Sequence, residues 1–136
     1  MARPKRILVV DDNLTLRVLL SQALEEAGYV AIAAESAEAA LEVARFDPPD
    51  LWLVDHHMPG MNGAQLIGLL RRSTDERLRG VPAIGLTGYE EAARDLVAAG
   101  AACALAKPLR EGPLLEQVAQ LLAGADARRG AALLPA

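Results

Sequence analysis

Polar side chains follow four short apolar runs, each at the point where the run ends. They supply three carboxylates, one hydroxyl and one ammonium group: Asp11, Asp12, Asp55, Thr87 and Lys107. In a parallel sheet the carboxyl ends of the strands lie along one edge, and ligands bind there. If the runs are neighbouring parallel strands, these five side chains therefore converge on one site.

Such a site favours phosphoryl transfer. Two carboxylates about 5 Å apart repel each other by roughly 3 kcal/mol at an effective dielectric of about 20. Lys107 offsets one charge, and Mg²⁺ (or Mn²⁺) would offset two more because it prefers oxygen ligands. The sequence has no GxxxxGK[ST] or GxGxxG motif, so a bound nucleotide is not indicated. Since an aspartate can itself accept a phosphoryl group, Asp55, alone at the end of its run, is the best candidate.

The elements that must position this site alternate along the chain. The apolar runs have four to six residues without polar alternation, which indicates strands buried on both faces. Between them, apolar residues recur three and four apart, as in helices. Ser36 is a candidate N-cap, and Gly28 and Gly100 are candidate helix ends. We expect strands at residues 7–10, 30–34, 51–54, 81–86 and 101–106, with a helix after each.

This alternation predicts an α/β fold with a five-stranded parallel sheet and helices on both faces. The flavodoxin-like strand order 2-1-3-4-5 is the natural one for five units. No linker divides the 136 residues, so we expect one domain over residues 1–124. The last helix is expected to end near Gly124, and residues 125–136 are interpreted as a flexible C-terminal tail.

Composition excludes several function classes. The net charge of −4 argues against a nucleic-acid groove or a polybasic membrane anchor. Cys103 is the single cysteine, so no internal disulfide or cysteine-based zinc site is expected. The apolar run at residues 7–10 is too short for a signal peptide or a membrane span. We therefore expect a cytoplasmic protein that does not interact with membranes.

Four segments together resemble the receiver domain of two-component response regulators. They are ILVVDDN (7–13), LVDHHMPGMNG (53–63), GLTGY (85–89) and ALAKP (104–108), in the order and spacing typical of that family. The resemblance covers about residues 5–123, nearly the whole chain. It implies that the chain takes a phosphoryl group from a sensor histidine kinase or a histidine phosphotransfer protein, and then acts on a downstream protein that the sequence does not identify.

The resemblance assigns Asp55 as the phosphoacceptor. It implies that Asp12 binds Mg²⁺ directly and that Asp11 contributes through water. Asp55 and the main-chain carbonyl of His57 would complete the contacts that the protein makes with the metal.

The residues after the fourth and fifth strands also receive roles from the resemblance. Lys107 would pair with the phosphoryl oxygens, and Thr87 would move to donate a hydrogen bond to them. Gly88 matches the small residue that leaves room for the phosphoryl group. The bond between Lys107 and Pro108 is expected to be cis.

One position departs from the family. Its switch aromatic, three residues before the lysine, is Ala104 here. We hypothesise that output instead uses backbone shifts in the loop after Thr87, helped by Tyr89. By the resemblance, Tyr89 and His57 occupy positions that in this family influence the access of hydrolytic water, so this bulky pair predicts a long-lived phosphorylated state.

Two other functions stay open at this point. Ala104 favours a degenerate receiver that is only an interaction module, whereas the complete acidic set and Lys107 argue against it. A small phosphatase of the haloacid dehalogenase type would need an aspartate where Asn13 stands, and it would need a cap domain. We therefore expect no enzyme activity beyond self-catalysed phosphoryl acceptance and slow autodephosphorylation.

Partners beyond the phosphodonor are less defined by the sequence. No DNA-binding segment is present in these 136 residues. A homodimer could form through the surface of the last two helices and the strand at residues 101–106. The chain could be a stand-alone receiver or a piece of a hybrid kinase or larger regulator.

Overall fold

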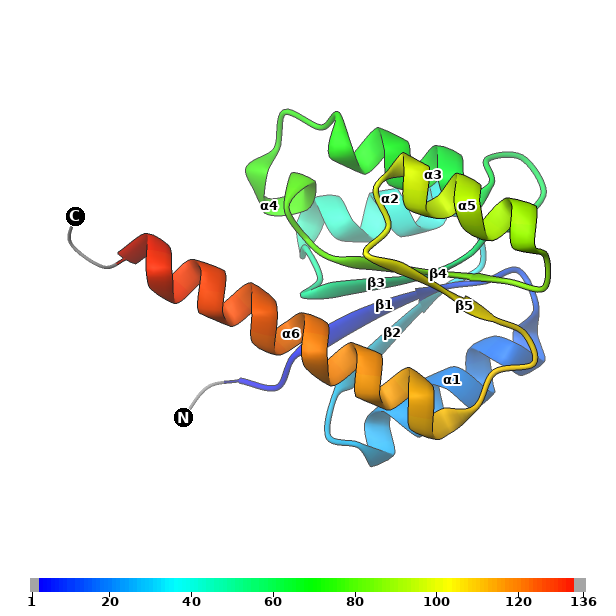
Figure 1. The fold of residues 1–136 in the computed structure, drawn as a ribbon, viewed down its shortest axis with the longest axis horizontal. Helices are drawn as coiled ribbons and strands as arrows, with labels where there is room; N and C mark the ends of the chain where they lie inside the picture. The colour runs from blue at the N-terminus through cyan, green and yellow to red at the C-terminus, as the bar shows by residue number, and fades with distance from the viewer. Residues whose placement is uncertain (1–2, 134–136) are drawn as a thin grey trace.

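The computed structural model describes residues 3–133, and their five strands form one parallel sheet (Figure 1). The strand order is β2-β1-β3-β4-β5, and every neighbouring pair is parallel. The predicted fold class and strand order are therefore confirmed. The strands are β1 (Arg6–Val10), β2 (Val30–Ala34), β3 (Leu51–Asp55), β4 (Ala83–Thr87) and β5 (Cys103–Ala106).

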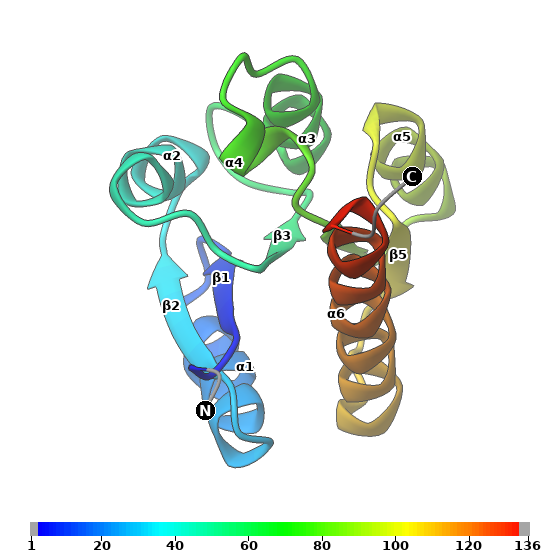
Figure 2. The ribbon, with the colours of Figure 1, turned by 90° about the vertical axis from the view of Figure 1, so that its left-hand side faces the viewer.

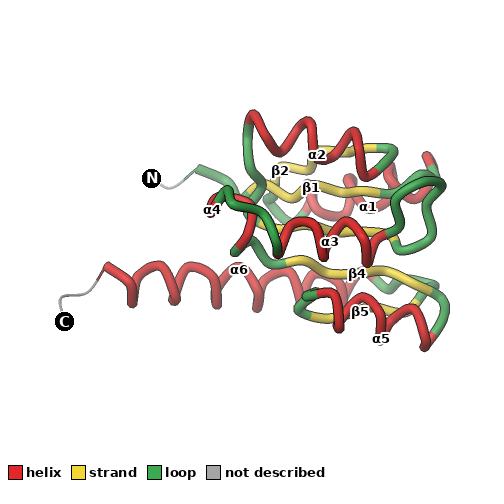
Figure 3. The backbone as a smooth tube through the Cα atoms, turned by 90° about the horizontal axis from the view of Figure 1, so that it is seen from above, coloured by secondary structure: helices red, strands yellow, loops and turns green. Residues whose placement is uncertain are grey.

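Helices cover both faces of the sheet. In Figures 1 and 2, α2, α3, α4 and α5 lie on one side, and α1 and α6 lie on the other. Figure 3 shows α2, α3 and α5 side by side across the first of these faces. The helices are α1 (Leu14–Glu26), α2 (Ala37–Phe46), α3 (Gly63–Arg71), α4 (Glu76–Arg79), α5 (Glu90–Ala99) and α6 (Glu111–Leu133).

Alternate residues of each strand enter two separate apolar cores. Leu8 and Trp52 are fully buried in the core under α2, α3 and α5, whereas Ile7 and Leu53 are fully buried in the core under α1 and α6. This division follows from strand geometry, because successive side chains point to opposite faces of the sheet. A strand covered on both faces must be apolar at every position, which is why the runs lack alternation.

Side-chain caps set where the helices begin. The Ser36 hydroxyl accepts a hydrogen bond from Ala39 N–H, as the sequence predicts, and the Asn13 side chain caps α1 in the same way. The predicted helix ends at Gly28 and Gly100 are also confirmed, since both glycines have the positive φ that ends a helix at low cost. These two caps fix the residues at which α1 and α2 begin.

Two helical features differ from expectation. The short helix α4 precedes β4 as a second helix after α3, where the alternation of strands and helices predicts only one. The predicted helix end near Gly124 is wrong, because α6 continues to Leu133 and extends beyond the end of the sheet (Figure 1). Alanines flank this glycine, and one glycine in a helix costs only about 1 kcal/mol. The flexible tail stays a prediction, and its residues 134–136 lie outside the described residues.

The long helix is joined to the beginning of the chain. Lys5 Nζ lies 2.8 Å from Asp126 Oδ1, so this ion pair links the segment before β1 to α6. Within the part of the chain that the structure describes, no helix has both the length and the apolar composition to cross a membrane.

Candidate functional site

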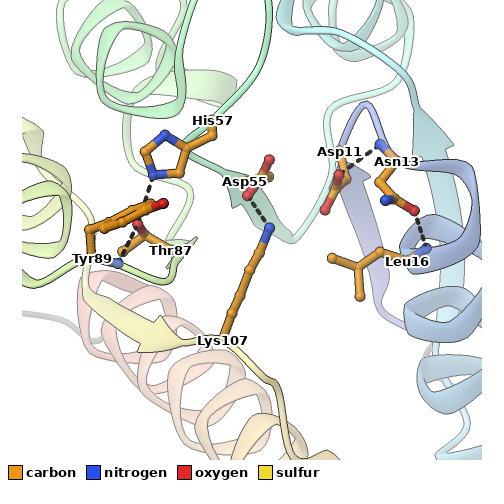
Figure 4. Close-up of polar contacts among 8 residues, drawn as sticks. All are labelled: Asp11, Asn13, Leu16, Asp55, His57, Thr87, Tyr89 and Lys107. Carbon is orange, nitrogen blue, oxygen red and sulfur yellow. Dashed lines mark hydrogen bonds and ion pairs between the residues drawn. The ribbon is translucent and has the colours of Figure 1, made fainter.

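The polar residues singled out in the sequence lie at the carboxyl ends of four neighbouring strands. Asp55 and Thr87 are the last residues of β3 and β4. Asp11 comes directly after β1, and Lys107 directly after β5. In Figure 4, Lys107 points towards Asp55, with Thr87 on one side of that carboxylate and Asp11 on the other. The fold thus brings together groups that are far apart in the sequence.

Three carboxylates form an acidic cluster. One oxygen from each of Asp11, Asp12 and Asp55 can be chosen so that all three atoms lie within 4.8 Å of one another. Asp11 and Asp55 are 1% and 2% exposed, whereas Asp12 is exposed to solvent. The cluster is therefore open on the Asp12 side, where an ion with several retained waters could enter.

The surroundings of Asp11 disfavour the charged form of its carboxyl group. Its Oδ1 accepts a hydrogen bond from Asn13 N–H at 2.9 Å, but its buried Oδ2 has no hydrogen-bond partner among the described residues. Burial raises the pKa of Asp11 above its ordinary value, and the charges of Asp55 and Asp12 raise it further. Hydrogen bonding by Asn13 and the charge of Lys107 oppose this rise in pKa.

The acidic cluster fits a hard divalent cation. A buried carboxylate oxygen without a hydrogen-bond partner is normally explained by an ion or a water, and Asp11 Oδ2 is such an atom. The donors are all oxygens, which is the ligand type that Mg²⁺ prefers. The described residues thus form an acidic pocket whose oxygen donors suit Mg²⁺.

Lys107 supplies the cation of the site. Its Nζ donates to Asp55 Oδ1 at 2.6 Å, and its backbone N–H donates to the Thr87 carbonyl at 2.9 Å. The second bond fixes the lysine backbone to the end of β4. The peptide bond between Lys107 and Pro108 is cis, as the resemblance implies.

Thr87 has neighbours that sequence reasoning did not anticipate. The Thr87 side chain is 2% exposed, and its Oγ1 lies 3.1 Å from His57 Nε2. The same oxygen accepts a hydrogen bond from Tyr89 N–H at 3.1 Å. The Tyr89 side chain is 67% exposed, and its ring meets the His57 ring edge-on with centroids 5.1 Å apart. No sequence signal pointed to the contact between His57 and Thr87.

A glycine behind Asp55 is a second feature that sequence reasoning missed. Gly63 begins α3, and its N–H donates to the His56 carbonyl at 3.0 Å. A Cβ added at Gly63 would lie 2.7 Å from the Asp55 carbonyl oxygen and 2.8 Å from His56 Cα. Only a glycine permits α3 to start this close to the end of β3. The position of Gly63 at the end of the HMPGMNG segment was the sequence feature that could have identified it.

The last two of the predicted site residues, Gly88 and Ala104, lie beside the site. An added Cβ at Gly88 would meet no heavy atom of the described structure within 4 Å, so the space next to this residue is open. Ala104 lies on β5 and lines a hollow of about 550 Å³ between that strand and α5. The other residues that line the hollow are Glu90, Ala93, Arg94, Val97 and Ala98.

Comparison with known proteins identifies the family of this chain. The family model of the response regulator receiver domain matches residues 7–119, and the chain therefore belongs to that family. Receiver domains are signalling modules of two-component phosphorelays, and they interact with histidine kinases or phosphotransfer proteins.

Relatives of this chain differ in length. The chain is 36% identical over 121 residues to the sensory/regulatory protein RpfC of Xanthomonas campestris, and the match covers 88% of the chain but only 17% of RpfC. It is 34% identical over 129 residues to protein PilH of Pseudomonas aeruginosa, covering 88% of the chain and 98% of PilH. The chain thus corresponds to a small part of the first relative and to nearly all of the second.

Solved structures support the same fold. The receiver domain of a signal transduction histidine kinase from Syntrophus aciditrophicus superposes with a TM-score of 0.81 at 31% identity. The superposition covers 88% of this chain and 91% of that chain.

Proposed function

We propose that Asp55 accepts a phosphoryl group from the phosphohistidine of a sensor kinase or phosphotransfer protein, in a reaction that requires Mg²⁺ or Mn²⁺. The observation that carries this proposal is the 2.6 Å contact between Lys107 Nζ and Asp55 Oδ1, at the rim of the three-carboxylate cluster. Asp55 is a buried carboxylate that lies between the Lys107 ammonium group and the two other carboxylates of the cluster. This arrangement is a preorganised site for a phosphoryl group.

The step forms one bond and breaks one bond. An Asp55 carboxylate oxygen bonds to phosphorus, and the nitrogen–phosphorus bond of the donor breaks, with its electron pair staying on the histidine nitrogen. Lys107 neutralises charge on Asp55 before transfer and on the phosphoryl oxygens afterwards. Asp11, Asp12, Asp55 and the main-chain carbonyl of His57 would hold the metal, which supplies further neutralisation of the phosphoryl charge.

Treatment with acetyl phosphate tests this proposal. With Mg²⁺, intact mass should show one phosphoryl group on the wild-type chain, and it should show none after a chelator is added beforehand. Asp55→Asn should remain unmodified under both conditions. Asp95→Asn removes an exposed carboxylate of α5 and serves as the matched control, so it should be modified like the wild type. Labelling of Asp55→Asn would refute the assignment of Asp55.

The labelling experiment and a phosphate-ester turnover assay separate the other two functions. A degenerate receiver would stay unmodified in its wild-type form, and Ala104 at the switch position is the feature that favours it. A phosphatase would turn over a phosphate ester such as p-nitrophenyl phosphate many times. We expect neither result, and we propose that activity is limited to phosphoryl acceptance and slow autodephosphorylation.

Output to the downstream protein is proposed to run through the loop after β4. Ala104 leaves a hollow where the family has an aromatic side chain, so Thr87 has no large ring on β5 to which it could couple. Amide chemical shifts of residues 88–110 should therefore change when a beryllofluoride mimic binds. Size-exclusion chromatography of the same sample tests the proposed homodimer through α5, β5 and α6. A cytoplasmic location is proposed with this role.

A further inference from the structure

His57 connects the loop after β3 to the hydroxyl at the end of β4. His57 Nε2 lies 3.1 Å from Thr87 Oγ1, and Tyr89 N–H donates a hydrogen bond to the same oxygen, also at 3.1 Å. Figure 4 shows these three residues together on one side of Asp55, while Asp11 lies on the opposite side. The Thr87 hydroxyl is thus engaged away from the acidic cluster.

The direction of this hydrogen bond depends on which ring nitrogen of His57 carries the proton. A threonine hydroxyl has one proton to donate and two lone pairs that accept. Tyr89 N–H occupies one lone pair of Thr87 Oγ1. Among the described residues, His57 Nε2 is the one side-chain atom that the structure places at hydrogen-bond distance from this hydroxyl, and Thr87 is 2% exposed. Because buried donors are normally paired, we take Thr87 as the donor in this contact, which requires the His57 tautomer that carries its ring proton on Nδ1.

Ring contacts hold the imidazole in this orientation. The His57 ring meets Tyr89 at an interplanar angle of 79° and His56 at 88°, with centroids 5.1 and 4.9 Å apart. Such edge-on contacts are favourable arrangements for aromatic pairs. They direct Nε2 towards Thr87 although His57 itself is exposed.

We propose that His57 is a positioning residue that holds Thr87 in the resting state and opposes the phosphorylated state. This inference rests on the proposed function. The Thr87 hydroxyl has one proton, so it can donate to a phosphoryl oxygen on Asp55 only after it leaves His57 Nε2. The resting state is therefore favoured by one hydrogen bond that the phosphorylated state lacks.

Binding of beryllofluoride to the full chain at saturating Mg²⁺ measures this effect. His57→Leu removes the acceptor and should bind beryllofluoride about two- to tenfold more tightly, which corresponds to one net hydrogen bond. His57→Gln keeps an acceptor oxygen at a similar reach and should bind like the wild type. Equal affinities for the wild type and His57→Leu would overturn the proposal.

A double-mutant cycle tests whether the effect passes through Thr87. In a Thr87→Val background, His57→Leu should change the affinity for beryllofluoride by less than the single variant does, ideally not at all. An undiminished change would show that His57 acts through another group and would overturn the proposal.

Nitrogen chemical shifts of the His57 ring give an independent readout. In the resting protein Nε2 should be unprotonated and Nδ1 protonated, and a proton on Nε2 would overturn the proposal. The proposed function fails separately: a wild-type chain that binds no beryllofluoride with Mg²⁺ overturns both ideas. A wild-type chain that binds it, with no gain in His57→Leu, overturns only the role of His57.

Discussion

Lys107 Nζ lies 2.6 Å from Asp55 Oδ1, although 52 residues separate the two in the sequence. β3 ends at Asp55, β5 ends just before Lys107, and β4 lies between the two strands. The lysine must therefore reach across the end of β4, where its backbone N–H is bound to the Thr87 carbonyl. Because Asp55 is buried, this ion pair is screened less by solvent than a surface pair would be.

Replacing Lys107 should slow phosphoryl acceptance more than it disturbs the fold. Lys107→Met keeps the length of the side chain but removes its charge. We expect the rate of labelling by acetyl phosphate to fall about 100-fold or more, the usual effect of losing one preorganised charge-stabilising group. A time course of intact mass measures this rate. Lys107→Arg, which keeps the charge, should lose less, and a wild-type rate in Lys107→Met would contradict the role of the lysine.

Removing the charge of Asp11 should stabilise the metal-free protein at neutral pH. Burial and two neighbouring carboxylates raise the pKa of Asp11 in the folded state above the ordinary value of 3.8. The folded state then binds the proton more tightly than the unfolded state, so stability is lost as pH rises from about 3.8 through the folded pKa. Asp11→Asn should raise the free energy of unfolding by about 1–2 kcal/mol above this window, because its amide can donate to the remaining carboxylates.

Urea unfolding in the presence of a chelator measures this gain. It should be present at pH 7 and should shrink towards pH 4, whereas Asp95→Asn on the exposed face of α5 should show no comparable gain. Mg²⁺ should stabilise the wild type, by about 1.4 kcal/mol at ten times its dissociation constant, and should stabilise Asp11→Asn less. A less stable Asp11→Asn at pH 7 without metal would refute this electrostatic account.

Much of the fold is predictable because the strands are buried on both faces. Residues 7–10 and 51–54 are fully buried, and their uninterrupted apolar character is the direct consequence. The fourth strand begins at Ala83 rather than at the predicted residue 81, and Pro82 explains part of this difference because proline has no N–H for the ladder. The length of α6 was not predictable, since a glycine among alanines is compatible with either outcome.

The convergence of the site was also predictable, but its fine structure was not. Strand order alone places Asp11, Asp55 and Lys107 at one edge. The contact between His57 Nε2 and Thr87 Oγ1 depends on a rotamer and on the path of a loop, and neither leaves a pattern in the sequence. The roles of these residues in phosphoryl transfer stay predictions.

Adding one methyl group at Gly63 should destabilise the site and the fold together. The new Cβ of Gly63→Ala would lie 2.7 Å from the Asp55 carbonyl oxygen, which is backbone and cannot move aside easily. We expect the free energy of unfolding to fall by about 1–3 kcal/mol, as for overpacking in a tight interior. Gly112→Ala is the control, since an added Cβ there meets no heavy atom of the described structure within 4 Å. Equal stability of the two variants in urea would contradict the close approach.

Tyr89 is expected to prolong the phosphorylated state by limiting the access of water. Its ring is 67% exposed and packs edge-on against the His57 ring, next to the buried Thr87 hydroxyl. Hydrolysis of an aspartyl phosphate needs a water on the far side of the phosphorus, and bulky side chains beside the site exclude water from it. Tyr89→Ala should therefore lose the phosphoryl group several-fold faster than the wild type.

The decay can be followed by intact mass after rapid removal of acetyl phosphate. Tyr89→Phe keeps the bulk of the ring and lacks only its hydroxyl, so it should decay at the wild-type rate. A faster decay of Tyr89→Phe would assign the effect to the hydroxyl rather than to the size of the ring. If Tyr89→Ala decays no faster than the wild type, Tyr89 does not shield the site from water.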